Sequence, residues 1–196
     1  MSAEPTVEDV VDLVERHLAV FPLPRGGRRP DSPGWSGRCL TTADAVRSHW
    51  PAGANVGIGC RVSAIVGLDL DLAGDGAATL ADMCTAHAAG WAQALDTLTV
   101  RTPSGGSHLY FRVAHWCTIP SSSGVLGPGI DVRGPGARSG GYLIGPGSTV
   151  DGTAYTITRD RPIRPLPAWL WRRLTGEQPV SLPPRHPGEP VRWWWL

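Results

Sequence analysis

Apolar residues recur at helical spacing near the start of the chain, from Val7 to Leu18. Thr6 precedes them and is a residue type that favours the N-cap of a helix, so we expect a first helix over residues 7–18. Similar patterns of apolar and capping residues predict three further helices, at residues 42–50, 75–89 and 167–174.

Runs of apolar and β-branched residues predict short strands through the middle of the chain. Residues 55–60 and 64–71 are expected to be adjacent strands, and 97–102 and 107–113 should form a hairpin around a Pro-Ser-Gly-Gly turn. The other expected strands lie at residues 19–24, 129–134, 141–147 and 153–158, with a loop at 114–129. Helices and strands in this order predict an α+β fold in one domain over residues 1–174.

Composition narrows the classes of protein that this pattern allows. The chain has 196 residues, of which 41% are hydrophobic and 18% charged, with a net charge of +1. These values exclude a charge-driven disordered chain and a globally basic nucleic-acid binder. All 18 residues in the Lys and Arg count are arginine, which a GC-rich codon bias explains best. Whatever its cause, the absence of lysine excludes a lysine nucleophile, a Schiff base and a P-loop lysine.

The cysteines and the N-terminus indicate a cytoplasmic protein. The four cysteines are too far apart in sequence for a CxxC zinc motif, and a chain of this length does not suggest a disulfide framework. The N-terminus is acidic and lacks an apolar signal core, and no apolar run approaches the ~18 residues of a membrane span. We therefore expect no membrane segment.

Two carboxylates follow an apolar strand at Asp69 and Asp71. Residues i and i+2 of a strand share a face, so the two side chains should lie together. Such a pair repels unless a cation compensates it, and Mg²⁺ or Mn²⁺ bound through oxygen ligands would do so. A solvated strand end with two acids remains an equal alternative.

A glycine-rich turn precedes His108. Ser104, Gly105, Gly106 and Ser107 combine backbone freedom with hydroxyl groups, which can cradle a phosphate. Alternation along the next strand should place His108, Tyr110 and Arg112 on one face. The alternative is an ordinary hairpin with a surface histidine.

A third acid, Asp131, stands between two β-branched residues that should be buried, with Arg133 on its own face. Alone, this is a common structural pair. Together with the acid pair and the turn with His108, it forms the equipment for nucleotidyl transfer: carboxylates for two divalent metals beside a phosphate-binding turn.

The motifs GLDLD, TPSGGSHLYF and GIDVRGPG, followed by GGYLIGPGS and a tyrosine, resemble in this order the bifunctional DNA primase/polymerase domain. That domain belongs to the archaeo-eukaryotic primase superfamily, which is common in plasmids, phages and integrated elements. The resemblance covers about residues 10–172. It implies a primase-like fold, in which an RRM-like antiparallel or mixed sheet with helices joins a second small α/β unit and the active site lies between them.

The resemblance also implies roles for the motif residues. Two Mg²⁺ or Mn²⁺ ions would be held by Asp69, Asp71 and Asp131, which serve as the catalytic acids. The nucleotide would be bound by Ser104, Gly105, Gly106, Ser107, His108 and Arg133. The substrates would be an NTP or dNTP and a DNA template or primer, and we expect Arg101, Arg112 and Arg138 to hold DNA.

The chain departs from its relatives in two segments. Where relatives often carry Lys-x-Pro in the N-terminal loop, this chain has Arg28-Arg29-Pro30. An arginine can replace a point charge near a phosphate, although its geometry is planar. Residues 148–151 also lack the histidine that many relatives carry after GPGS.

Residues 175–196 are rich in proline, arginine and tryptophan and should form an extended tail. Its Trp193–Trp195 run could stack on bases, dock on a partner such as a helicase, or fold back onto the domain. Two rivals to polymerase activity remain: a non-catalytic module that binds DNA or a replication protein, and a metal-dependent nuclease.

Overall fold

The computed structural model describes residues 4–87 and 95–177, and it combines helices with mainly antiparallel sheets. The helices are α1 (Val7–Glu15), α2 (Ala43–His49), α3 (Cys60–Ser63), α4 (Gly76–Ala86) and α6 (Ala168–Thr175), with a 3-10 turn η1 (Trp35–Arg38). The strands are β1 (Val20–Leu23), β2 (Asn55–Gly59), β3 (Ile65–Leu70), β4 (Thr99–Arg101), β5 (Ser107–Arg112), β6 (Ser122–Ser123), β7 (Ile130–Arg133), β8 (Tyr142–Ile144), β9 (Thr149–Val150), β10 (Thr153–Ala154), β11 (Thr156–Arg159) and β12 (Arg164–Pro165). This mixture agrees with the expected α+β class.

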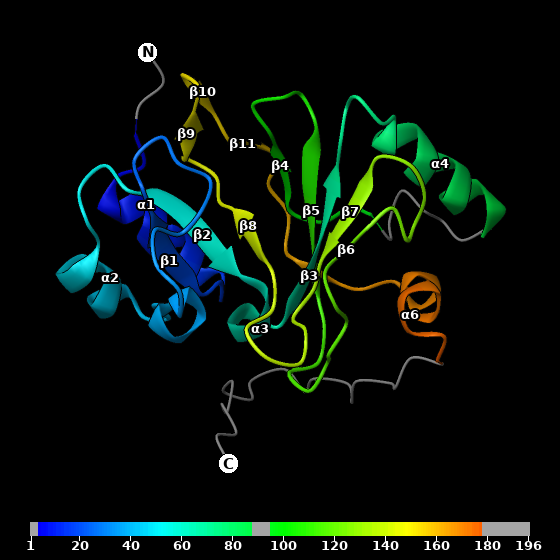
Figure 1. Cartoon of the computed structure of the whole chain (residues 1–196), viewed down its shortest axis with the longest axis horizontal. Helices are drawn as coiled ribbons and strands as arrows, with labels where there is room; N and C mark the ends of the chain where they lie inside the picture. Colours follow the sequence, from blue (N-terminus) through cyan, green and yellow to red (C-terminus); the bar gives the residue numbers. More distant parts are fainter. Residues whose placement is uncertain (1–3, 88–94, 178–196) are drawn as a thin grey trace.

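The strands form two principal sheets. The small sheet has the order β1-β2-β8, and the large sheet has the order β11-β4-β5-β3-β7-β6, with β12 parallel to β5. Strands β9 and β10 form a separate two-stranded pair. Helices α1 and α2 lie on the side of the small sheet, whereas α4 and α6 lie on the opposite side of the large sheet (Figure 1).

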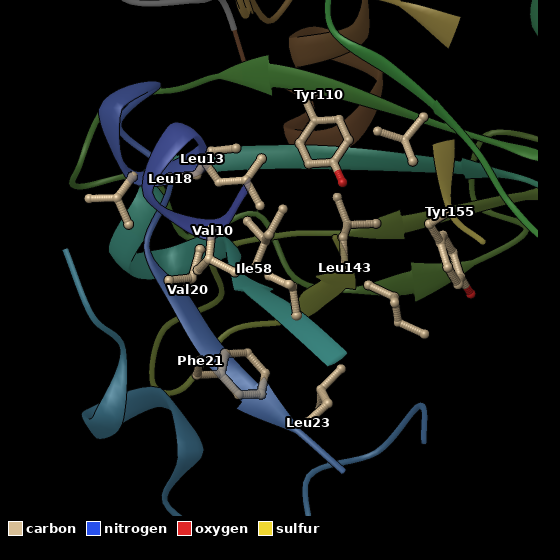
Figure 2. Packing of buried hydrophobic residues seen from close by; sticks show 14 of the residues in the cluster. Val10, Leu13, Leu18, Val20, Phe21, Leu23, Ile58, Tyr110, Leu143 and Tyr155 are labelled. Carbon is tan, nitrogen blue, oxygen red and sulfur yellow. The ribbon is translucent and has the colours of Figure 1, made fainter. Parts of the chain in front are cut away.

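The central strands β3 and β5 of the large sheet are buried on both faces, and each face belongs to a different hydrophobic core. Ile65 and Tyr110 face the first core, which contains α1 and the small sheet. Val66 and Phe111 face the second core, which α4 and α6 cover. Figure 2 shows the Tyr110 side chain pointing into the first core, toward Ile58 and Leu143. Period-two alternation therefore sends neighbouring residues of β3 and β5 to opposite cores.

The expectation that residues 55–60 and 64–71 form adjacent strands is wrong. Strand β2 pairs with β1 and β8, while β3 pairs with β5 and β7 in the other sheet. The short helix α3 and a left-handed residue, Ala64 (φ 50°), separate β2 from β3 and turn the chain from one sheet into the other. This crossing brings the two sheets face to face.

Gly67 of β3 marks a point where the sheets touch. A Cβ atom at this position would lie 2.3 Å from Cδ1 of Leu143 in β8. The absence of a side chain at Gly67 thus lets β8 pack directly on β3.

Thr6 caps the first helix as predicted, and Thr42, the first residue of the second predicted helix, caps that helix. The Thr6 side chain accepts from the Asp9 N–H, and the Asp9 carboxylate accepts from the Thr6 N–H at 2.8 Å, which forms a capping box. Thr42 caps α2 in the same manner through the Ala45 N–H. Helix α1 ends at Glu15, earlier than expected, because His17 turns into the left-handed region (φ 60°).

Other boundaries differ in detail. The predicted hairpin is confirmed as β4 and β5. The segment expected as one strand at 153–158 divides into β10 and β11, because Tyr155 leaves the strand to bond with the main chain of Gly147 and Ser148. The expected loop at 114–129 contains the short strand β6.

Two expectations extend beyond the described residues. The end of the helix predicted at 75–89 and most of the tail predicted at 175–196 fall there. Among the residues that the structure describes, no helix has both the length and the apolar character needed to cross a membrane.

Candidate functional site

Three neighbouring strands of the large sheet bring the predicted residues together. Asp69 on the central strand β3 is the register partner of His108 on β5 and of Asp131 on β7. Directly paired residues share a face of the sheet. The two acids and the histidine therefore stand side by side on the face that looks toward the small sheet, the same face as Tyr110 in the first core.

Arg133 connects the two carboxylates. One guanidinium nitrogen of Arg133 lies 2.9 Å from Oδ2 of Asp131 and 3.7 Å from Oδ2 of Asp69. This contact confirms the prediction that Asp131 and Arg133 share a face, and the neighbours Ile130 and Val132 are buried as expected. The guanidinium supplies the positive charge that the pair of acids requires.

Asp69 is held in its ionised form. Burial by itself raises the pKa of Asp69, but His108 and Arg133 together outweigh burial and bring the pKa below its usual value. Nε2 of His108 lies 3.4 Å from Oδ1 of Asp69. Asp69 is thus a carboxylate with one cationic neighbour on β7 and one titratable neighbour on β5.

Asp71 lies just beyond β3, and its side chain is exposed. Its main chain is fixed, because the Asp71 N–H donates to Gly129 and its carbonyl accepts from the Gly76 N–H. Gly74, Gly76 and Gly129 let these backbones approach, since a Cβ on Gly76 would lie 2.1 Å from the Gly129 oxygen. The sequence reading missed this glycine cluster, which GxG spacing after the acid pair could have indicated.

The three carboxylates are not gathered into a ready metal centre. Across residues 4–87 and 95–177, no group of three or more His, Cys, Asp or Glu side chains is arranged to hold a metal ion. The donor set nevertheless suits a hard divalent ion, because Asp69 and Asp131 face each other across paired strands and already need a cation. In this structure Arg133 provides that charge.

His108 is nearly enclosed and has one nitrogen without a hydrogen-bond partner. Its side chain is 5% exposed, and Nδ1 is buried without a hydrogen-bond partner among the described residues. The ring of Tyr155 lies 5.5 Å away, centroid to centroid. The sequence reading did not assign a role to Tyr155, whose strand break turns it toward the site.

The turn before His108 backs onto the end of β3. A Cβ on Gly106 would lie 2.3 Å from the Leu70 carbonyl oxygen, so only glycine fits there. Gly105 has φ +89°, and its N–H donates to Thr102 within the turn. Ser104 is exposed and its hydroxyl bonds with that of Thr102, whereas Ser107 opens β5 and is half-buried. The turn thus lies beside the end of β3, next to Asp69 and Asp71.

The loop that follows β1 reaches the same site from the small sheet. The Tyr142 hydroxyl donates to the Arg28 carbonyl, and the Arg28 guanidinium pairs with Asp151 at 3.0 Å. Burial raises the pKa of Tyr155, and the nearby charges of Arg28 and Asp69 act on it in opposite directions. Arg28 therefore stands close to the cluster, where relatives were expected to carry a lysine.

The three arginines predicted to hold DNA occupy different environments. Arg101 on β4 and Arg138 in the loop after β7 are exposed. Arg112 is half-buried and donates to the main-chain carbonyls of Arg16, His17 and Ser63. Those bonds fasten β5 to the ends of α1 and α3, which gives Arg112 a structural task.

The arrangement combines cation-binding carboxylates, a histidine and a serine-containing turn in one place, which is suited to binding a metal-complexed polyphosphate. The family model for the N-terminal domain of bifunctional DNA primase/polymerases matches residues 10–169. A search of curated proteins finds no match to the chain. The match spans the predicted acids, the turn and every strand of the large sheet.

Proposed function

This chain belongs to the bifunctional DNA primase/polymerase family, and we propose that it joins nucleotides on a DNA template by nucleotidyl transfer. One observation carries the proposal: Asp69, His108 and Asp131 are register partners on one face of the large sheet. The primase-like arrangement, with an RRM-like sheet and a second α/β unit around the site, is part of the same proposal.

We assign the binding of Mg²⁺ or Mn²⁺ to Asp69, Asp71 and Asp131. When bound, two such ions would supply the positive charge needed to activate an attacking 3′-hydroxyl and to stabilise a leaving pyrophosphate. The protein contributes carboxylates on rigid neighbouring strands. Asp71, exposed at the end of β3, would complete the set from the open side.

The triphosphate would lie between the turn at 104–107 and the cluster around Arg133. His108 presents a ring held by Asp69, and the Ser104 and Ser107 hydroxyls can donate to phosphate oxygens. Arg133 pairs with carboxylates in this structure and can pair with phosphate once cations take over those carboxylates. His108 and Arg133 would thus orient the nucleotide without forming a bond to it.

The template would run along exposed arginines, including Arg101 and Arg138. We further propose that residues 1–174 form the catalytic domain and that residues 175–196 contact another replication protein, such as a helicase.

The direct test is template-directed synthesis. The full chain is incubated with a single-stranded DNA template, with and without a primer, and with labelled dNTPs or NTPs plus Mg²⁺ or Mn²⁺. We expect Asp69→Asn and Asp131→Asn to lower incorporation by about 100-fold or more, because each removes a carboxylate charge that would hold the cations on which the transition state depends. Asp82→Asn makes the same chemical change on the exposed face of α4 and should leave synthesis unchanged.

The products identify the rival functions. Synthesis by Asp69→Asn at the wild-type rate would disprove the mechanism. A shortened labelled strand would indicate a nuclease. DNA binding that is equal with and without chelator, with no incorporation under any condition, would indicate a non-catalytic binding module.

A further inference from the structure

A shallow depression of about 400 Å³ lies between the loop of residues 29–33 and the small sheet. The rings of Trp35 and Tyr142 line it together with that loop. A volume of this size is within the range of small-molecule sites. None of the roles assigned above uses this depression.

Its aromatic wall is fixed in place by the first core. Trp35 stacks on the buried ring of Phe21, with centroids 4.5 Å apart and planes inclined by 27°. Tyr142 meets Trp35 edge to face at 5.1 Å. Both lining rings are only partly buried. A ligand would therefore meet a preformed apolar surface and would not need to order it.

The opposite wall is polar and charged. Arg29, Asp31 and Ser32 line it beside two prolines. A carboxylate accepts hydrogen bonds from ring and amino N–H groups, and a serine hydroxyl both donates and accepts. The Tyr142 hydroxyl donates to the Arg28 carbonyl and thereby ties this loop to the aromatic wall.

The depression adjoins the proposed phosphate site. Leu143 packs on Gly67, and Gly67 is the register partner of Arg133. Gly141, the residue before Tyr142, packs on the main chain of Arg133, since a Cβ on Gly141 would lie 3.4 Å from Cα of Arg133. In agreement, burial raises the pKa of Tyr142, while the charges of Arg29 and Arg133 lower it. The depression therefore lies next to the segment that packs on Arg133.

We propose that this depression binds the base and sugar of a nucleoside 5′-triphosphate whose phosphates extend toward Arg133 and His108. Flat aromatic walls with a few polar groups suit a base, since every base has a π-face and stacking tolerates differences in sequence. An inorganic phosphate would gain nothing from Trp35 and Tyr142. The assignment rests on the proposed function and names the substrate subsite.

Equilibrium binding separates the base from the phosphates. Binding of a non-hydrolysable nucleoside triphosphate and of inorganic tripolyphosphate to the full chain is measured with Mg²⁺ and without DNA. We expect Trp35→Ala to weaken nucleotide binding about tenfold and to leave tripolyphosphate binding unchanged, because only the nucleotide stacks. Trp35→Phe keeps a ring and should retain most of the affinity.

One matched control and two variants of the polar wall keep the test independent of folding. Trp116→Ala removes an equally large ring that is 59% exposed and packs near α6, and it should affect neither ligand. Ser32→Ala and Asp31→Asn alter the polar wall without touching the core and should change the preference among the four bases.

The outcomes are distinct. Unchanged nucleotide binding in Trp35→Ala, or an equal loss of nucleotide and tripolyphosphate binding, would overturn the subsite. A separate titration with a single-stranded oligonucleotide tests a template base at the same place: if Trp35→Ala weakens oligonucleotide binding and leaves nucleotide binding unchanged, the subsite is also overturned. A chain that binds nucleotide through Trp35 but never extends a strand would contradict the proposed polymerase activity and leave the subsite intact.

Discussion

Arg133 serves as the counter-ion for two carboxylates that stand on adjacent strands. The same guanidinium nitrogen contacts Asp69 and Asp131, at 3.7 and 2.9 Å. Without a positive charge these acids would repel each other, and one of them would favour its protonated form. A bound divalent cation would perform the same neutralisation, so the arginine and the metal compete for one role.

Replacing this arginine should make the protein depend on metal for stability. In chelator, we expect Arg133→Gln to lower stability by about 1 kcal/mol, a modest value because the three side chains are about one-third exposed. Added Mn²⁺ should restore the loss. Thermal unfolding with chelator and with Mn²⁺ measures both effects.

Arg133→Lys is the matched control, since it keeps the charge and loses only the planar geometry. Its unfolding temperature in chelator should stay near the wild-type value. If Mn²⁺ stabilises wild type and Arg133→Gln equally, the arginine does not act as the counter-ion.

At the scale of elements, Arg112 joins β5 to two helices. The C-terminal carbonyls of α1 have no partners within the helix, and the same holds for the end of α3. Arg112 donates to carbonyls at the C-terminal end of α1 and at the C-terminal end of α3. Its positive charge suits the negative C-terminal end of a helix. The strand that carries His108 is therefore anchored to the first core by its last residue.

Substitution of Arg112 should affect the stability of the protein more than it affects DNA binding. We expect Arg112→Gln to lower the free energy of unfolding by about 1–2 kcal/mol, because two partly buried carbonyls and one exposed carbonyl lose a charged donor. Urea unfolding followed by circular dichroism checks this expectation. The exposed Arg101→Gln should leave stability unchanged and reduce the salt dependence of DNA binding by about one ion. Wild-type stability in Arg112→Gln would refute the anchoring role.

The sequence predicted the local parts of these elements better than their pairing. Alternation placed His108 with Tyr110, and Asp131 with Arg133, because side-chain direction in a strand depends only on position. The separation of β2 from β3 into two sheets was missed, since it depends on one helical turn and a left-handed alanine. The places of Trp35, Tyr142 and Tyr155 beside the site were also not predictable, because contacts between distant segments arise only in the folded chain.

At the scale of the whole molecule, the large sheet is shared by the two cores. One face packs against α1 and the small sheet, and the other against α4 and α6. Neither core can be lost without exposing a face of the same strands. The described parts of the chain should therefore unfold as one cooperative unit.

A destabilising substitution in the second core should thus also lower the stability of the first core. Leu170 in α6 is fully buried, so Leu170→Ala should cost about 2–5 kcal/mol. The β2 amides belong to the small sheet. Their hydrogen-exchange rates should rise by the factor that corresponds to the loss in the free energy of global unfolding. Protection of β2 that is unaffected by Leu170→Ala would show that the cores unfold separately.

The contact between Gly67 and Leu143 fills the space between the sheets on one side of the acids. Gly67 lies two residues before Asp69 on the same face of β3, and Leu143 covers the strand there. Asp71, in contrast, is exposed where β3 ends. In the proposed reaction, a metal ion held by Asp71 would therefore exchange with solvent at that end of β3, whereas protein fills the level of Gly67.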